Sequence, residues 1–341
     1  MLFLPMSAVL FGGKKSSGAV FWGWLFVFLC FSSIIGLRFE VGGDWLAYLG
    51  YLDRASSIGF FSIFNYGDPG YYFVNWAASK IGMGIYFVNT FCASVLVAGV
   101  ILFSRRQPIP WLAFLISVPY LLIVVGMGYS RQATALGFVL FAINAFQDRK
   151  TFSFVFWVVL AAAFHKSAVI MLPVFALAYG GNRLWNIAWM GAVSVIGAYL
   201  FVFDSVSSLW AGYVVSDYES EGALVRVVMN SIPAFVFLKY RSAFGLDDGV
   251  GRLWWWVSFL AIICIPLVLL SSTATDRVAL YLIPLQLFVF SRLPLLLSSA
   301  RNRASVLLAI VAYYVLVQFV WLFFAGHAYA WLPYQMYPFS S

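Results

Sequence analysis

The chain has 341 residues, of which 64% are hydrophobic, 20% aromatic and only 9% charged. Soluble globular domains average about 45–50% apolar and about 25% charged residues, so the composition excludes a water-soluble fold and indicates an integral membrane protein. The net charge of +8 does not indicate a nucleic-acid partner, because the 20 basic residues are scattered between long apolar runs. The three cysteines lie inside apolar stretches, without the spacing of a disulfide framework or a zinc site.

Apolar segments that suit transmembrane helices recur along the whole chain. A spanning helix needs about 20 apolar residues, and shorter segments suffice when they are tilted or broken. Eleven segments are predicted, at residues 19–37, 81–103, 109–127, 130–146, 152–164, 167–181, 185–203, 223–238, 253–271, 278–291 and 304–324. The first is not expected to be a cleaved signal peptide, because it runs on into Arg38 without a small-residue cleavage site. We therefore predict an all-α polytopic membrane protein in which residues 1–341 form a single transmembrane domain.

The distribution of basic residues predicts the orientation of the bundle. With the N-terminus in the cytoplasm, 13 of the 20 Lys and Arg residues fall on the inside and 7 on the outside, whereas nine of the 12 acidic residues fall outside. This predicts an N-in, C-out topology, with external loops at about 38–80 and 204–222 and an external tail at about 325–341.

Several predicted external charges lie at helix ends among apolar neighbours. Ionisable groups at membrane depth are costly unless paired or hydrated, so they are candidates for function. They are Arg38, Glu40, Asp44, Arg131, His165, Lys166, Asp276 and Arg277. The external loops also interleave carboxylates with Trp and Tyr, a combination that suits a sugar ligand. The aromatic belt of any membrane protein is the alternative explanation for each single Trp or Tyr.

Five motifs, taken in their order and spacing, resemble the EpsG family of bacterial exopolysaccharide proteins, which is similar in role to Wzy-type O-antigen and capsule polymerases. The motifs are Arg38-Phe-Glu-Val-Gly-Gly-Asp44-Trp-x-x-Tyr48, Asp68-Pro-Gly-Tyr-Tyr, Arg131-Gln132-x-x-Ala135, Phe164-His165-Lys166-Ser167-Ala168 and Asp276-Arg277-x-x-x-Tyr281, followed by Trp331-Leu-Pro-Tyr334. Relatives commonly have Glu where this chain has Asp68. The resemblance covers residues from about 38 to 334.

The resemblance implies a GT-C-type glycosyltransferase in the bacterial inner (cytoplasmic) membrane. Such an enzyme joins oligosaccharide repeat units carried on undecaprenyl diphosphate at the periplasmic face. The implied partners are this lipid-linked oligosaccharide, the lipid bilayer and a chain-length regulator, with no nucleic acid. The positions carried over from the family are Asp44, Arg131, His165, Lys166, Arg277 and Tyr281.

A diphosphate-linked donor requires cations. Arg131 and Arg277 each precede a predicted span at its external end, where a helix N-terminus and a bidentate guanidinium both suit phosphate. Snorkelling to lipid headgroups is the alternative for each. Lys166 and Arg38 complete the expected diphosphate contacts. Contacts to the sugar or other parts of the substrate are expected from Gln132, Tyr281, Asp276, Asp68 and Tyr48.

Inverting glycosyl transfer needs one base and no acid, because the diphosphate leaves as an anion. Asp44, Glu40 and His165 are the candidate bases, and the sequence does not choose among them. Asp44 has an alternative as the cap of an interfacial helix starting at Trp45. His165 has one as a histidine satisfied by a backbone carbonyl. No metal site and no cofactor are expected, since Glu40 and Asp44 alone are weak evidence for a metal.

Three other functions compete with polymerisation. An O-antigen-ligase-type glycosyltransferase shares the two-cation chemistry, so the sequence does not separate it. A flippase for lipid-linked oligosaccharides predicts charges along the bundle interior on both sides of the midplane. A membrane acyltransferase predicts a polar path from a cytoplasmic acyl donor. Most embedded charges lie at the external ends, with Gln286 and Gln318 as polar exceptions, and this favours surface chemistry.

Overall fold

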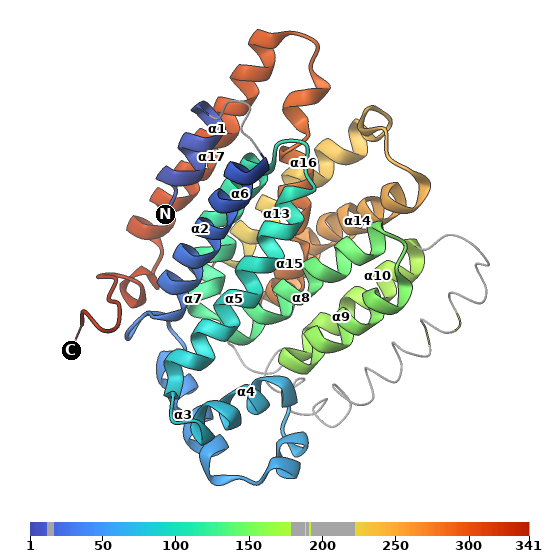
Figure 1. Ribbon diagram of the computed structural model, residues 1–341. Helices are drawn as coiled ribbons and strands as arrows, with labels where there is room; N and C mark the ends of the chain where they lie inside the picture. Colours follow the sequence, from blue (N-terminus) through green and yellow to red (C-terminus); the bar gives the residue numbers. More distant parts are fainter. Residues whose placement is uncertain (12–16, 179–187, 189–190, 192–221, 341) are drawn as a thin grey trace.

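The computed structural model describes residues 1–11, 17–178, 188, 191 and 222–340. Over these residues the protein is a bundle of helices, and the only β pairing is one bridge between Arg38 and Met336 (Figure 1). The predicted helix at 185–203 lies outside the described residues, apart from residues 188 and 191. The same holds for the predicted external loop at 204–222, apart from residue 222.

In the described part of the chain, the predicted segments are helical. The helices are α1 Phe3–Phe11, α2 Ser17–Gly36, α3 Trp45–Ser57, α4 Pro69–Lys80, α5 Gly84–Arg105, α6 Pro110–Ser117, α7 Gly126–Gly128, α8 Ser130–Gln147, α9 Thr151–Phe164, α10 Met171–Ala178, α13 Ala223–Lys239, α14 Asp248–Leu270, α15 Ser272–Leu282, α16 Pro284–Phe290 and α17 Ala300–Phe324. Of these, α1, α3 and α4 lie outside the predicted segments, and α3 and α4 belong to the predicted external loop at 38–80. Shorter turns are the 3-10 helices η1 Phe60–Asn65, η3 Lys166–Ile170, η6 Arg241–Phe244, η7 Leu293–Leu296 and η8 Ala328–Ala330, and the π-helix η2 Val118–Val125.

Five helices of the described residues are long and apolar enough to cross a membrane. They cover Gly18–Gly36, Gly84–Arg105, Pro110–Gly128, Asp248–Leu270 and Ala300–Phe324. A sixth span results if Ser272–Leu282 and Pro284–Leu296, which are bent by 43°, are counted together. The other predicted segments that lie in the described residues are helical but shorter or more polar. The protein is therefore an all-helical, multi-pass membrane protein, while the count of eleven spans and the orientation stay predictions.

The tenth predicted segment begins earlier than the sequence indicates. We expected residues 278–291, whereas α15 already begins at Ser272. The polar run that opens α15 does not have the composition of a membrane span, but it is helical and places Arg277 in the second turn. Pro284 then opens α16 after the bend, because proline lacks the N–H that would continue the hydrogen-bond ladder of α15.

Close helix packing in the core depends on glycine. A Cβ on Gly99 of α5 would lie 2.6 Å from the carbonyl oxygen of Gly137 on α8. A side chain at either position would push the two backbones apart, so small residues let α5 and α8 approach closely, as at many membrane-helix interfaces. On its other side α8 packs against α9, where Phe138 stacks on Trp157 with ring centroids 5.7 Å apart.

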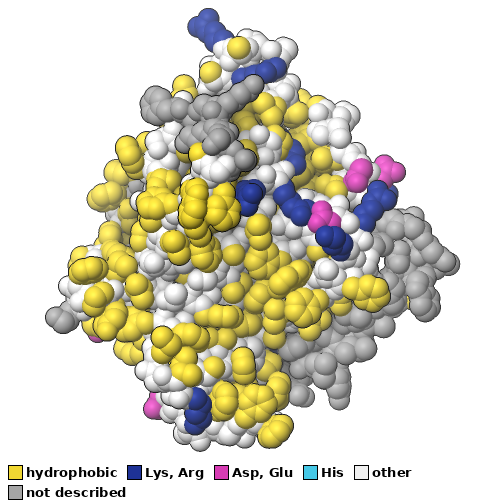
Figure 2. Space-filling model, viewed as in Figure 1, with side chains coloured by type: hydrophobic (Ala, Val, Ile, Leu, Met, Phe, Trp, Pro, Cys, Tyr) yellow, Lys and Arg dark blue, Asp and Glu magenta, His cyan; other side chains and the backbone are white. Residues whose placement is uncertain are grey.

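The outer surface is apolar over much of the bundle. Figure 2 shows hydrophobic side chains spread across the middle of the face it displays, while most visible charges lie toward the upper end. Exposed apolar side chains include Phe26 on α2, Leu269 on α14 and Phe323 on α17. Such a surface is unstable in water and suits lipid, so it agrees with the composition.

The C-terminal tail folds back onto the segment that follows α2. The backbone N–H of Phe39 donates to Gln335 at 3.0 Å, and that of Gly42 donates to Ala330 at 2.7 Å. The indole of Trp331 donates to the carbonyl of Ile123 in the π-helix η2 at 3.2 Å. The first and last motifs of the sequence analysis therefore form one packed unit beside α7.

Candidate functional site

Polar side chains from several elements meet at the end of the bundle that carries α3 and α4, at the bottom of Figure 1. Here α2 ends, α5 begins, α8 begins after Tyr129, and α9 joins η3 at His165. The clearest link is an ion pair in which Arg131 Nη1 lies 2.6 Å from Asp68 Oδ2. It joins the residue before α4 to the second residue of α8.

Asp44 and Asp68 stand at the N-cap positions of α3 and α4, but neither side chain makes a capping hydrogen bond. Asp247, by contrast, caps α14 in the usual way, because its carboxylate accepts the backbone N–H of Val250 at 2.7 Å. The carboxylates of Asp44 and Asp68 therefore do not cap their helices. Asp68 is directed to Arg131 instead, and the structure does not support the cap interpretation of Asp44.

Glycines beside Asp68 allow the surrounding chain to approach. A Cβ on Gly70 would lie 2.8 Å from the Phe164 ring at the end of α9. A Cβ on Gly67 would lie 3.1 Å from both Cε and Nζ of Lys166. The Asp-Pro-Gly motif is thus a close-packed turn that brings Lys166 over the residue next to Asp68, and the Asp68 carboxylate also accepts the backbone N–H of Lys166.

The Arg131 guanidinium keeps hydrogen-bonding capacity beyond its ion pair. Its Cζ lies 4.7 Å from the centre of the Tyr51 ring, which supports one face. Its Nε is buried and has no hydrogen-bond partner among the described residues. About a quarter of the side chain, 26%, is exposed. Arg131 is therefore held in place by Asp68 and Tyr51 while it keeps donors for a ligand.

Asp44 shares the electrostatic environment of this cluster. Burial raises the pKa of Asp44, and the opposing charges of Arg131 and Arg277 counter part of that rise. The hydroxyl of Tyr48 donates to the same carboxylate. Burial likewise raises the pKa of Asp68, against the cations Arg131 and Lys166. The carboxylates of Asp44 and Asp68 thus interact with the cations Arg131 of α8, Lys166 of η3 and Arg277 of α15.

His165 belongs to a chain of hydrogen bonds. Its Nδ1 lies 2.6 Å from Ser167 Oγ, which in turn donates to the Tyr281 hydroxyl at 3.2 Å. When the Ser167 hydroxyl donates to Tyr281, the serine oxygen accepts Nδ1–H, so Nε2 carries the free lone pair. Arg131, Arg277 and Lys166 act electrostatically on the imidazole. The structure thereby brings together residues from α8, the α9–η3 junction and α15.

Arg38 and Glu40, which were expected at the substrate site, lie outside the cluster around Arg131. Arg38 is 1% exposed, and its guanidinium donates to the carbonyls of Ile35 and Val41 and to the side chains of Asn89 and Ser130 at 2.8–3.1 Å. These bonds tie the end of α2 to α5 and α8. Glu40 is exposed, has a left-handed φ of 51°, and interacts with Tyr86. The geometry favours a structural role for Arg38 and does not bring Glu40 to Arg131.

Asp276 forms a second buried ion pair that the sequence did not indicate. Arg226 Nη1 of α13 lies 2.5 Å from Asp276 Oδ2, with side-chain exposures of 8% and 11%. The Arg226 guanidinium also lies 5.5 Å from the Tyr120 ring centre. Tyr129 interacts electrostatically with Arg226, Asp44 and Arg277, so this pair borders the first cluster. Gln132 is buried on α8 next to Arg131.

Sequence reasoning missed three contributors: Tyr51, Ser167 and Arg226. Ser167 lies inside a motif quoted above, and the signal for it was a hydroxyl two residues after a candidate histidine. Arg226 was counted only for topology, although an arginine in an apolar helix needs a buried partner. Nothing in the local sequence around Tyr51 marks it as the support for Arg131.

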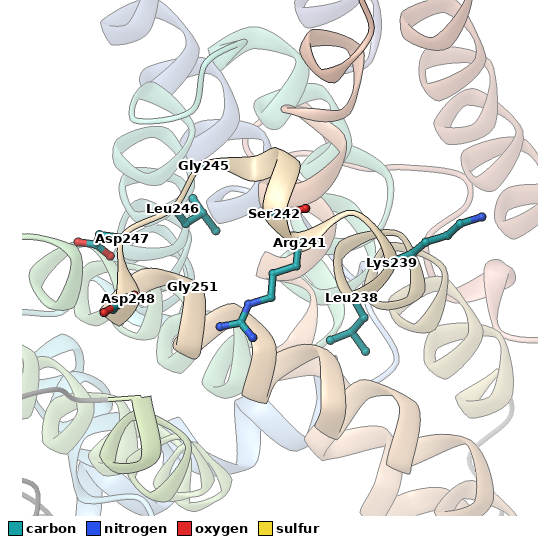
Figure 3. A pocket seen from close by; sticks show the side chains of 9 residues that line it. All are labelled: Leu238, Lys239, Arg241, Ser242, Gly245, Leu246, Asp247, Asp248 and Gly251. Carbon is teal, nitrogen blue, oxygen red and sulfur yellow. The ribbon is translucent and has the colours of Figure 1, made fainter.

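A pocket of about 470 Å³ lies at the opposite end of the bundle, between α13, η6 and α14 (Figure 3). The Arg241 side chain extends from η6 toward α14, and Asp247 and Asp248 stand at the start of α14. None of the predicted site residues lines this pocket. Among the described residues, no three His, Cys, Asp or Glu side chains are grouped so that they could hold a metal ion.

One comparison with known proteins found a match over nearly the whole chain. The sequence model of the EpsG family matches residues 21–336. No curated protein and no solved structure matches the chain. The matched range includes the complete polar cluster, from Asp44 to Tyr281, and confirms the resemblance drawn from the five motifs.

Proposed function

The chain belongs to the EpsG family, and on that premise we propose that it is an exopolysaccharide polymerase of the inverting glycosyltransferase class. It transfers a growing glycan from undecaprenyl diphosphate to a hydroxyl of another lipid-linked repeat unit. The observation that carries this proposal is the Arg131–Asp68 pair, set among Lys166, Arg277 and His165 at one end of an apolar bundle. A GT-C-type bundle is the architecture that the family resemblance implies.

The donor diphosphate would bind to the cations of the cluster. Arg131 is oriented by Asp68 and Tyr51 and offers its remaining guanidinium donors, while Arg277 and Lys166 supply further positive charge. Charge-assisted contacts of this kind stabilise the departing diphosphate as negative charge develops on it. Asp68 limits the net positive charge in the absence of substrate and fixes the direction of the guanidinium.

We assign His165 the role of general base and Asp44 that of orienting the acceptor hydroxyl. His165 Nε2 accepts the hydroxyl proton, the sugar oxygen attacks the anomeric carbon, and the bond to the phosphate oxygen breaks with inversion. The electron pair of that bond leaves with undecaprenyl diphosphate. Ser167 and Tyr281 hold the tautomer that keeps Nε2 unprotonated.

The same cations would make the basicity of His165 depend on donor binding. Burial and the neighbouring Arg131, Arg277 and Lys166 hold the pKa of His165, at the junction between α9 and η3, well below its usual value. A diphosphate bound to those cations offsets their charge and makes the imidazolium less unfavourable. Donor binding thus strengthens the base at the moment when it is needed.

The cluster would face the periplasm. The described residues at the opposite end carry a clear excess of basic over acidic side chains, which the positive-inside rule assigns to the cytoplasm. The basic residues are Arg105, Arg106, Arg149, Lys150, Lys239, Arg241, Arg252, Arg292, Arg301 and Arg303, and the acidic residues are Asp148, Asp247 and Asp248. In the inner (cytoplasmic) membrane that the family resemblance implies, a site with this orientation would meet lipid-linked repeats on the periplasmic side. A chain-length regulator is an expected partner from the family resemblance.

The experiment is to replace Arg131, Arg277 or His165 singly with Ala in a polymer-producing cell and to follow polymer length, lipid-linked repeats and membrane levels of the protein. Polymerisation predicts that single lipid-linked repeats accumulate externally while long polymer disappears. Long polymer at wild-type levels in all three variants contradicts the proposal. Repeats held on the cytoplasmic face indicate a flippase, and polymer that forms but is not attached to its acceptor indicates a ligase.

A further inference from the structure

An apolar groove runs between α2 and α5 at the end of the bundle remote from the polar cluster. It has a volume of about 210 Å³. Its wall is formed by Phe21, Trp24, Leu25 and Phe28 of α2 and by Ala98, Ile101, Leu102 and Arg105 of α5. Both helices are long and apolar enough to cross the membrane. The groove therefore opens where lipid acyl chains surround the protein.

The shape of the groove is set by aromatic packing and by one small residue. Trp24 stacks on Trp111 of α6 with ring centroids 4.1 Å apart and an interplanar angle of 7°, which gives the groove a fixed flat side. Ala98 leaves space on α5 at the level where a larger side chain would fill it. A straight apolar chain fits such a slot, whereas a sugar would leave its hydroxyl groups without partners.

Arg105 gives the groove a charged end. It is the last residue of α5, it is exposed, and its side chain makes no hydrogen bond or ion pair with any described residue. The next residue differs in this respect: Arg106 binds Asp148 through two hydrogen bonds of 2.7 and 2.9 Å. Of two adjacent arginines at the helix end, one is thus neutralised by the protein and the other lies at an apolar slot.

We propose that this groove is a binding site for an anionic phospholipid of the phosphatidylglycerol class. One acyl chain lies between α2 and α5, and the headgroup phosphate accepts hydrogen bonds from Arg105. The assignment follows from charge complementarity, because a guanidinium that no described residue neutralises, at the end of an apolar groove at headgroup level, favours an anionic over a zwitterionic lipid. It does not depend on the proposed enzymatic function.

The test uses the full-length chain purified in detergent. Thermal unfolding is measured while dioleoylphosphatidylglycerol or dioleoylphosphatidylcholine is added, and bound lipid is counted by native mass spectrometry. We expect phosphatidylglycerol to stabilise the wild type more than phosphatidylcholine does. Arg105→Ala should weaken the apparent affinity for phosphatidylglycerol about fivefold, which corresponds to the attraction of one basic residue for an anionic surface.

Two further variants complete the test. Arg106→Ala lowers the basal stability but should keep the preference for phosphatidylglycerol, because Arg106 is committed to Asp148. Ala98→Trp fills the groove and should abolish the preference without a change of charge. Equal loss of preference in Arg105→Ala and Arg106→Ala would show diffuse surface attraction and overturn the proposal, as would full retention in Ala98→Trp. Stabilisation by inorganic phosphate alone would also contradict it, since no acyl chain would then be needed.

Discussion

Asp68 and Arg131 lie 63 positions apart in the chain, yet their side chains meet at 2.6 Å. Asp68 precedes the first turn of α4 and Arg131 stands in the first turn of α8. The pair therefore anchors the α3–α4 segment to the bundle and fixes the guanidinium that we assign to the diphosphate. Because Asp68 is only 9% exposed, water screens this contact less than it screens a surface ion pair.

Replacing Arg131 by Ala should reduce polymer formation at least about tenfold, because one charge-assisted hydrogen bond is worth about 1.5–3 kcal/mol. Lys at this position should rescue poorly, since it lacks the planar fork. Arg54→Ala is the matched control, because Arg54 also lies over the Tyr51 ring, at 5.0 Å, but is exposed and outside the ion pair. Polymer length on gels at equal protein level gives the readout. Equal effects of the two variants would contradict the assignment.

His165→Ala should lower the transfer rate about 100-fold or more, as expected for the loss of a general base. Ser167→Ala should lower it about fivefold, because one hydrogen bond that sets the tautomer is lost, and Ser167→Thr should restore it.

Because the pKa of His165 is held low, the free enzyme stays active as the pH falls below about 6.5 and loses kcat/KM only at lower pH. A membrane assay of glycan transfer measures the rates of these variants, and the same assay repeated across pH measures the loss of kcat/KM in acid.

The roles of His165 and Asp44 are separated by their conservative variants. Asp44→Asn keeps a group that orients a hydroxyl, so it should retain more activity than His165→Gln. The reverse order would reassign the base to Asp44.

The buried pair Arg226–Asp276 should be important for stability. Arg226→Met leaves an uncompensated carboxylate at a site where both side chains are about nine-tenths buried, and the expected cost is about 3–5 kcal/mol. The double variant Arg226→Met/Asp276→Leu should be more stable than either single variant. Thermal unfolding in detergent measures this. The control is Arg106→Met, whose pair with Asp148 is 39% and 33% exposed and should contribute less than about 1 kcal/mol.

Gly42 and its neighbour Gly43 offer a test of the docked tail. Gly42 has a φ of +103°, and a Cβ there would lie 2.3 Å from the Met127 carbonyl, whereas nothing lies within 4 Å of a Cβ on Gly43. Gly42→Ala should therefore weaken the bond to Ala330 and release the tail, at a cost of about 1–3 kcal/mol. Limited proteolysis with a C-terminal tag should show faster tail cleavage for Gly42→Ala only. Identical cleavage of both variants would argue against the docking.

The orientation is tested with two exposed serines at opposite ends of the bundle, Ser56 in α3 and Ser242 in η6. In intact spheroplasts an impermeant maleimide should label Ser56→Cys, and it should label Ser242→Cys only after the membrane is opened. The native cysteines are buried or half-buried, and the parent protein measures their background. The opposite pattern would place the polar cluster in the cytoplasm and exclude external polymerisation.

The local sequence was sufficient for the membrane class, for most helix positions and for the family. Long apolar runs between polar breaks define helices without reference to distant residues, and five ordered motifs identify the family. Where the composition was misleading, as in the polar start of α15, the predicted boundary was wrong by six residues. Helix formation there follows from backbone geometry and neighbours rather than from apolar composition.

Only the tertiary structure decided which charges act together. From the sequence, Arg38 and Arg131 were both expected to contact the diphosphate. In the structure, Arg38 is enclosed by protein acceptors, whereas Arg131 keeps donors beside Asp68. The sequence also could not show that Ser167 lies between His165 and Tyr281, because Ser167 and Tyr281 are 114 positions apart in the chain. The physical reason is the range of the forces: apolar periodicity acts within a helix, whereas an ion pair or hydrogen bond between helices depends on how distant segments pack.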